Sequence, residues 1–261
     1  MSAKIKANRN TIIAYMLLTI SFCAMLISGY QLWNIQREDH ESHERYEQLV
    51  NKVRPDGFVY VPPEVLSGYL NDVEILEMSI DFMALKEISK NAVAWLYSPN
   101  TVIDYPVMRT YDYDQYLRHL PDGTYNTNGS LFIDYNNMPD FSDSLTVIYG
   151  HNMKTGWMFG SLEGYKSQTY FEKHPYMYLY TASDNFRIDL IYGFVIEASE
   201  WREKAFMYKE NLHDLLSYAA YNTTFTSEVR YTGNERVVAL STCSYEFKGA
   251  RYVVIGVLRS C

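Results

Sequence analysis

Eight short apolar segments within residues 92–258 are the feature that most constrains the fold of this chain. Each is rich in β-branched and aromatic residues and is bounded by Gly, Pro, Asn or Asp, which is typical of strands between turns. The segments are AVAWLYS, TVIDYPVM, GSLFIDYN, SLTVIYGH, MYLYTA, FRIDLIYGFVI, VVALSTC and RYVVIGVL. Because a closed barrel leaves no strand edge unpaired, we predict a mainly β fold, a closed eight-stranded barrel.

Helical patterns interrupt the strands in three places, at residues 114–119, 159–166 and 206–221. The last of these lies in a long connection, residues 201–237, just before the segment VVALSTC. Most connections between strands are only a few residues long, so a function is expected for this insertion. Upstream of the barrel, Ser79 and Asp81 precede FMALKEISK, a pattern that predicts a capped helix.

A stretch without charged residues, TIIAYMLLTISFCAMLISGYQLW, covers residues 11–33. As a helix rising roughly 1.5 Å per residue it would cross a hydrocarbon core of about 30 Å. Basic residues precede it and acidic residues follow it, which favours a cytoplasmic N-terminus. A cleaved signal peptide is the alternative, but the small-x-small cleavage pattern is missing, and Phe22 does not suit lipoprotein processing at Cys23.

These patterns divide the chain into four parts. We expect a cytoplasmic N-terminus at residues 1–10, a transmembrane anchor at 11–33, a polar stalk with an N-terminal helical extension at 34–78, and the barrel domain at 79–261. The protein would then be a single-pass protein of the cell membrane, with its barrel domain outside the cell.

Charge and cysteine content exclude several classes of function. All 31 acidic residues and all but three of the 23 basic residues follow the apolar stretch, and an acidic domain of this kind would repel nucleic acid. Three cysteines, Cys23, Cys243 and Cys261, provide no disulfide framework. HExxH, CxxC, phosphate-loop and dinucleotide-binding patterns are absent, so we expect no metal and no cofactor.

Three residues at strand ends could carry chemistry. Cys243 closes one predicted strand and Arg251 opens the next, so a hairpin would place both at one end of the sheet. A nearby cation favours the thiolate and can stabilise an oxyanion. His151 follows SLTVIYG at another strand end and could act as an acid or a base. A buried structural cysteine beside a surface arginine is the alternative interpretation of the first two.

The same residues resemble those of a known family, the class B sortases. LSTCSYEFKGARYVVIG resembles the cysteine and arginine strands of that family, and YGHNMKTGWMFGSL resembles its histidine loop and the helix that follows. NAVAWLYSPNTVIDYPVM and GSLFIDYNN resemble its early barrel strands. The N-terminal helical extension and the long insertion before the cysteine strand also point to class B. Ala239 stands where many members have threonine, a mild departure.

The resemblance implies an activity. Cys243 would attack a C-terminal sorting motif of a secreted protein and form a thioester, Arg251 would stabilise the oxyanion, and His151 would protonate the leaving amine. An amino group of a peptidoglycan precursor or of a pilin would then accept the acyl group. Asn152, Ser241, Thr242 and Tyr245 are expected to contact substrate, and the insertion to form one wall of the groove.

Two other functions remain open from the residues alone. A membrane-anchored cysteine protease would use the same thiol and imidazole, although papain-type enzymes place the cysteine before the histidine, whereas here His151 precedes Cys243. A non-catalytic surface barrel with an incidental thiol is the other. Alkylation of Cys243 would abolish turnover in an enzyme and leave a binding module unaffected.

Overall fold

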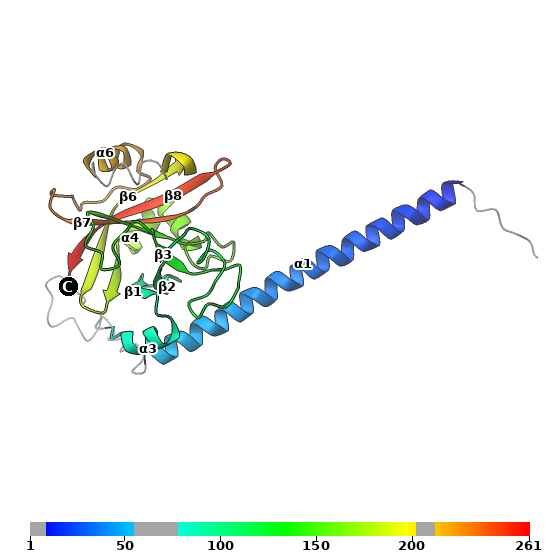
Figure 1. Ribbon diagram of the computed structural model, residues 1–261. Coiled ribbons are helices and arrows are strands. Elements are labelled where there is room, and N and C mark those ends of the chain that lie inside the picture. The colour runs from blue at the N-terminus through cyan, green and yellow to red at the C-terminus, as the bar shows by residue number, and fades with distance from the viewer. Residues whose placement is uncertain (1–8, 55–77, 202–211) are drawn as a thin grey trace, which may run out of the picture. The chain divides into compact units, whose positions relative to one another are not determined.

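The computed structural model describes residues 9–54, 78–201 and 212–261 of the chain (Figure 1). The chain divides into two compact units, Met1–Glu44 and Arg45–Cys261. The second unit contains all eight strands.

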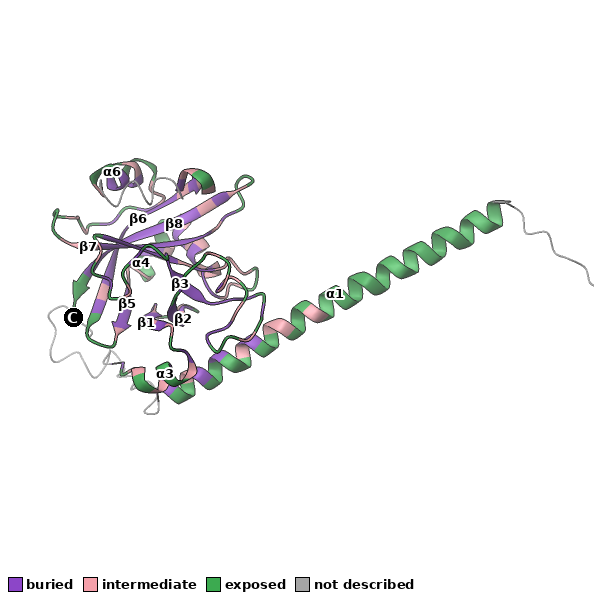
Figure 2. Cartoon of the chain, in the orientation of Figure 1, coloured by how far each residue is buried: buried purple, intermediate pink, exposed green. Residues whose placement is uncertain are grey.

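Helix α1, Arg9–Val53, begins in the first unit. Its large apolar side chains from Ile12 to Ile35 are exposed, as the green colour of this part of the helix shows in Figure 2. The helix is long and apolar enough to cross a membrane. Apolar side chains exposed in such numbers are favourable in the hydrocarbon core of a membrane.

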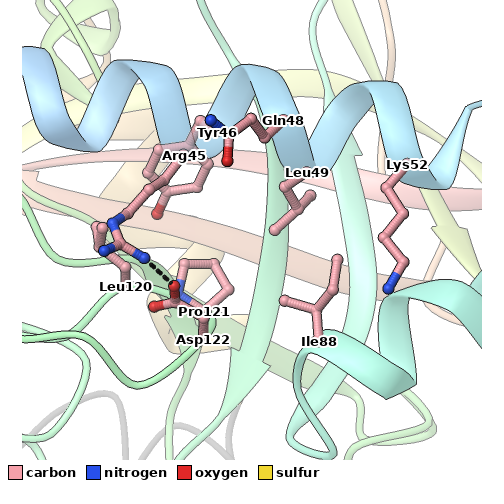
Figure 3. Close-up of a pocket in the computed structure, with 9 residues that line it drawn as sticks. All are labelled: Arg45, Tyr46, Gln48, Leu49, Lys52, Ile88, Leu120, Pro121 and Asp122. Carbon is pink, nitrogen blue, oxygen red and sulfur yellow. Dashed lines mark hydrogen bonds and ion pairs between the residues drawn. The ribbon is translucent and has the colours of Figure 1, made fainter.

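The last turns of α1 belong to the second unit and pack within it. Leu49 and Val53 are buried, and the Tyr46 hydroxyl donates to the Gly129 carbonyl at 2.9 Å. Arg45 forms an ion pair with Asp122. A cavity of about 200 Å³ lies here, between α1 and a loop of the barrel (Figure 3).

The eight predicted strands are all present. They are β1 Ala92–Tyr97, β2 Asp104–Arg109, β3 Leu131–Ile133, β4 Leu145–Tyr149, β5 Tyr176–Thr181, β6 Asn185–Glu197, β7 Arg236–Cys243 and β8 Ala250–Ser260. They close into a barrel in the order β1-β2-β3-β4-β7-β8-β6-β5. The pairs β2–β3 and β4–β7 are parallel, and the others are antiparallel. The prediction of a closed β-barrel is confirmed.

Side chains along β7 alternate between two apolar cores, as the two-residue period of a strand requires. Along β7, Val238 and Leu240 point into the barrel interior with residues of the other strands. Val237 and Ala239 point outward and pack in a second core with residues of α6, Leu212–Asn222. In Figure 1, α6 lies over the outer face of β6.

The remaining helices are short. Helix α3, Phe82–Ile88, begins where the sequence predicts, because the Asp81 carboxylate accepts a hydrogen bond from the Ala84 amide at 2.9 Å. The predicted helix at 159–166 is the 3₁₀ helix η1, Gly160–Lys166, followed by α4, Gln168–Lys173. The predicted helix at 206–221 is observed as α6, while residues 206–211 lie outside the described part.

The predicted helix at residues 114–119 is wrong: this segment forms turns. A helix this short gains little from its own hydrogen bonds, and its carbonyl groups bond to distant parts of the chain instead. The Tyr116 carbonyl accepts from the Ser130 amide at 2.8 Å, and the Arg118 carbonyl accepts from the Asn126 amide at 2.9 Å. The Leu117 carbonyl contacts the imidazole of His151.

Candidate active site

Cys243 and Arg251 are direct cross-strand partners. Cys243 is the last residue of β7 and pairs in register with Arg251 near the start of β8. The turn between them is closed by a hydrogen bond from the Ser244 amide to the Ala250 carbonyl, at 2.9 Å. Both side chains are half-buried. The hairpin expected from the sequence therefore places thiol and guanidinium at one edge of the barrel.

Parallel pairing of β4 with β7 brings His151 to the same edge. Tyr149, the last residue of β4, is the register partner of Ser241, and the Gly150 amide then donates to the Ser241 carbonyl at 3.2 Å. The Thr242 hydroxyl donates to the Gly150 carbonyl at 2.8 Å. His151 follows immediately, two residues beyond the end of the strand.

Gly150 is required by space. A Cβ atom at this position would lie 2.4 Å from Leu131 Cδ2 and 2.8 Å from the ring of Phe159. Real Cβ atoms do not approach other atoms so closely, so a side chain here would displace the side chains of Leu131 and Phe159 or the loop itself.

Cys243, His151 and Arg251 line one cavity of about 170 Å³. Four aromatic residues also line it: Tyr113, Phe132, Tyr149 and Trp201. His151 Nε2 lies 2.8 Å from the Leu117 carbonyl oxygen. Since a carbonyl oxygen only accepts, Nε2 carries a proton, and Nδ1 is the nitrogen left to exchange a proton with another group.

The four residues expected to contact substrate fall into two groups. Ser241 and Thr242 are buried and line the cavity. The Thr242 hydroxyl donates to the Gly150 carbonyl, whereas the Ser241 hydroxyl has no hydrogen-bond partner among the described residues. Asn152 and Tyr245 are not among the residues that line the cavity. Asn152 Nδ2 donates to the Cys243 carbonyl at 2.7 Å, and Tyr245 is exposed.

Several cavity residues were missed by the sequence analysis. Two of them are tyrosines: the hydroxyls of Tyr113 and Tyr149 both donate to Asp134 Oδ2, at 2.9 and 3.0 Å. Leu117 lies in the segment that had been predicted as a helix. Trp201 begins the long insertion, which was the only signal that could have indicated it.

Known proteins resemble the chain in sequence and in structure. Sortase B of Listeria monocytogenes is 31% identical over 185 residues, which cover 70% of this chain and 75% of the relative. The X-ray structure of Clostridium perfringens sortase B matches with a TM-score of 0.64 at 28% identity, covering 68% of this chain and 99% of that structure. A class B sortase of Streptococcus pyogenes involved in pilus biogenesis matches with a TM-score of 0.61 at 27% identity, covering 68% and 97%. No protein-family profile matches the chain.

The relatives are sortases, which are cysteine transpeptidases. The closed barrel of this chain has the fold of these enzymes. The extent and identity of the sequence match narrow this class further. The chain belongs to the class B sortases. It is therefore a cysteine transpeptidase with a sortase-type barrel.

Proposed function

We propose that this sortase cleaves a C-terminal sorting motif of secreted proteins through Cys243, and transfers the acyl group to an amino nucleophile of the cell wall. The observation that supports this most directly is the register pair Cys243–Arg251, which lines the same cavity as His151. Cys243 and Arg251 come from neighbouring strands and His151 from the loop after β4, so the three residues meet only in the folded barrel.

In the first half-reaction, the Cys243 thiolate attacks the carbonyl carbon of the peptide bond to be cleaved. The S–C bond forms, the C–N bond breaks, and the departing amine takes a proton from His151. The product is a thioester between the enzyme and the secreted protein. In the second half-reaction an amine attacks the thioester, a new C–N bond forms, the C–S bond breaks, and the neutral imidazole accepts the proton of the amine.

Arg251 is proposed to stabilise the negative charge that develops on the carbonyl oxygen. A guanidinium presents several N–H donors in a fixed plane, which suits an oxyanion better than a single ammonium group. Only one hydrogen bond of its guanidinium is seen in the described part of the chain, from Nη1 to the Ala250 carbonyl at 3.1 Å. Donors thus remain for substrate.

Substrate binding is proposed for Ser241 and Thr242 in the cavity, and for Asn152 and Tyr245 beside it. Ser241 is the best supported, because a buried hydroxyl without a partner gains a hydrogen bond when a peptide group enters. The insertion that begins at Trp201 is proposed as one wall of the peptide groove.

We also propose that residues 11–33 anchor the enzyme in the cell membrane, with residues 1–10 in the cytoplasm, 34–78 as a stalk and extension, and 79–261 as the catalytic domain outside. Lys4, Lys6 and Arg9 before the apolar stretch support this orientation. Anchoring raises the effective concentration of membrane-bound substrate and of a lipid-linked acceptor. Protease added to intact protoplasts should degrade the domain after Trp33. If that domain is degraded only after the cells are lysed, the orientation is the opposite one.

Mass spectrometry of the reaction tests the function. The enzyme is incubated with a small library of sorting-motif peptides, with and without an added amine such as triglycine. A sortase forms a thioester on Cys243 and, with the amine, yields the new amide. A protease yields hydrolysis alone in both samples, and a binding barrel leaves every peptide intact. Enzyme alkylated at Cys243 serves as the control.

A further inference from the structure

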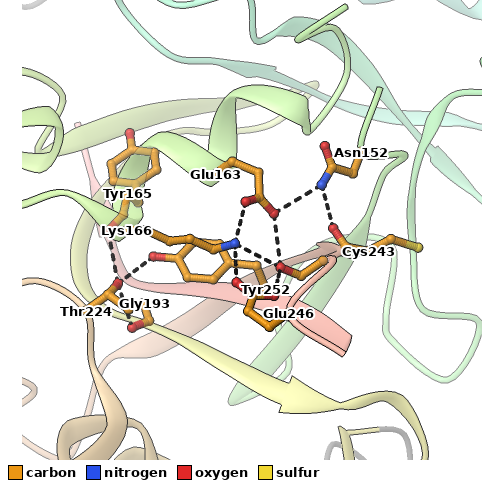
Figure 4. Close-up of polar contacts among 10 residues, drawn as sticks. Asn152, Glu163, Tyr165, Lys166, Gly193, Thr224, Cys243, Glu246 and Tyr252 are labelled. Atoms are coloured by element: carbon orange, nitrogen blue, oxygen red, sulfur yellow. Dashed lines mark hydrogen bonds and ion pairs between the residues drawn. The ribbon is translucent and has the colours of Figure 1, made fainter. Parts of the chain in front are cut away.

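A cluster of polar side chains gathers around Lys166, on the last turn of η1 (Figure 4). Lys166 forms ion pairs with Glu163, one turn earlier, and with Glu246, in the turn between β7 and β8. Its Nζ also donates to the Ser244 hydroxyl at 2.9 Å. One ammonium group thus links η1 to the turn that follows Cys243.

The cluster contacts the residue that follows each reactive residue. Asn152, which follows His151, donates through Nδ2 to Glu163 Oε1 at 3.1 Å and to the Cys243 carbonyl at 2.7 Å. Ser244, which follows Cys243, has its hydroxyl oxygen 3.1 Å from Glu163 Oε1. Tyr252, which follows Arg251, has the center of its ring 5.2 Å from Lys166 Nζ.

Strand geometry explains why Tyr252 faces the cluster. Successive side chains of a strand point to opposite faces, so Arg251 lines the cavity while Tyr252 points into the barrel interior. The Tyr252 hydroxyl is in turn 2.6 Å from the Thr224 hydroxyl, in the segment after α6. The reactive residues are therefore exposed to substrate on one side and fixed through their neighbours on the other.

Burial and charge indicate that the cluster is more than a surface ion pair. The side chains of Lys166, Glu163 and Glu246 are 29%, 33% and 36% exposed, whereas those of the pair Lys52–Glu87 are 50% and 72% exposed. Partial burial weakens screening by water. Burial opposes ionisation, yet hydrogen bonds from Lys166 and Ser244 leave the pKa of Glu246 below its ordinary value.

We propose that Lys166 and Glu163 are positioning residues for the sortase reaction, which set the relative placement of His151, Cys243 and Arg251 through Asn152, Ser244 and Tyr252. This inference rests on the proposed roles of the three reactive residues. Without the ammonium, Glu163 and Glu246 repel each other, and the turn 244–249 moves away from η1. Cys243 and Arg251 flank that turn, so they move with it, while the other residues that line the cavity, such as Tyr149 and Trp201, stay in place.

Three variants test the proposal: Lys166→Met, Lys166→Arg and Glu246→Gln. Lys52→Met is the matched control, because it removes an ammonium from an exposed ion pair. We expect Lys166→Met to lower kcat for peptide cleavage about ten- to a hundredfold, since small displacements of reacting groups have effects of this size. KM should stay within about twofold, because the peptide contacts remain. Glu246→Gln should have a smaller effect in the same direction, and Lys166→Arg should restore most of kcat.

A second measurement does not depend on turnover. The rate of Cys243 alkylation by iodoacetamide, followed against pH, reports the surroundings of the thiol directly. Lys166→Met should shift this profile, and Lys52→Met should leave it unchanged. Thermal unfolding shows whether Lys166→Met is folded. If it is not, Glu246→Gln in the exposed turn supplies the same comparison.

The proposal is overturned if folded Lys166→Met keeps the kcat and the alkylation profile of the wild type, or if Lys166→Arg is as impaired as Lys166→Met. An equal loss of kcat in Lys52→Met would also overturn it, because removal of an ammonium group far from this cluster would then lower kcat just as much. Failure of the proposed function gives a different result: the wild type would only hydrolyse the peptides, with or without added amine, or would leave them intact. The alkylation profile would still decide the role of Lys166.

Discussion

The middle and the end of the β7–β8 hairpin differ in what they contribute to this enzyme. In the middle, register pairs such as Leu240–Val254 are fully buried, with other strands on both sides. At the end, Cys243 and Arg251 are half-buried and face a cavity. A few residues separate a segment whose role is packing from one whose proposed role is chemistry, so stability and activity should respond to different substitutions within one hairpin.

The difference arises from where the neighbouring strand stops. β4 pairs with β7 only as far as Ser241, and its chain then leaves the sheet at Gly150. β7 continues to Cys243. The Cys243 carbonyl therefore has no strand beside it on that side and accepts from the Asn152 side chain. Ending one strand two residues early opens the sheet and creates room for substrate.

Replacement of Cys243 by alanine should have the largest effect on turnover. We expect peptide cleavage and thioester formation to fall by at least about a thousandfold, as when other covalent nucleophiles are removed. The unfolding midpoint should stay close to that of the wild type, because a half-buried thiol contributes little packing. Activity assays and thermal unfolding measure the two quantities. Cleavage well above the uncatalysed rate would contradict the proposed role of Cys243.

Arg251→Lys should have the second largest effect. It keeps the positive charge but loses the planar set of donors, so we expect kcat/KM to fall on the order of a hundredfold. Steady-state kinetics with a sorting-motif peptide measure this. A lysine variant within a few-fold of the wild type would show that Arg251 acts through its charge alone.

Ser241→Ala should have a smaller effect, confined to substrate binding. The Ser241 hydroxyl lines the cavity and has no hydrogen-bond partner within residues 9–54, 78–201 and 212–261, so its loss breaks no hydrogen bond seen there. One hydrogen bond to the peptide corresponds to about a two- to tenfold rise in KM, with stability unchanged. Thr242→Val is the contrasting variant, because it removes the hydrogen bond to Gly150 and should lower stability. Unchanged KM in Ser241→Ala would exclude this contact.

Leu240→Ala should have the smallest effect on turnover and a large effect on stability. Leu240 is fully buried in the barrel interior, and its truncation should lower the free energy of unfolding by about 2–5 kcal/mol. Urea denaturation measures this loss, and kcat of the folded fraction at low temperature should match that of the wild type. If kcat of the folded fraction also fell steeply, the middle of the hairpin would contribute to turnover as well as to packing.

The sequence was sufficient to predict the eight strands and the hairpin that brings Cys243 and Arg251 to one end of the sheet, because strand periodicity and strand ends are local signals. That His151 acts together with them was implied by the family resemblance. It could not predict that residues 114–119 form turns, since their hydrogen bonds go to residues such as Ser130 and His151. The cluster around Lys166 was missed for the same reason. Ser244 is 78 positions from Lys166, and no local pattern records that contact.

The order of strands in the barrel also has a consequence for how the enzyme is made. β8 lies between β7 and β6, so the ring closes only when the last of the eight strands is inserted. Synthesis proceeds from the N-terminus, and Cys243 therefore emerges before Arg251 and the strand that carries it. Non-local pairings of this kind form late in folding. A chain that lacks β8 therefore has Cys243 without its cross-strand partner Arg251, and the proposed acyl transfer requires all eight strands.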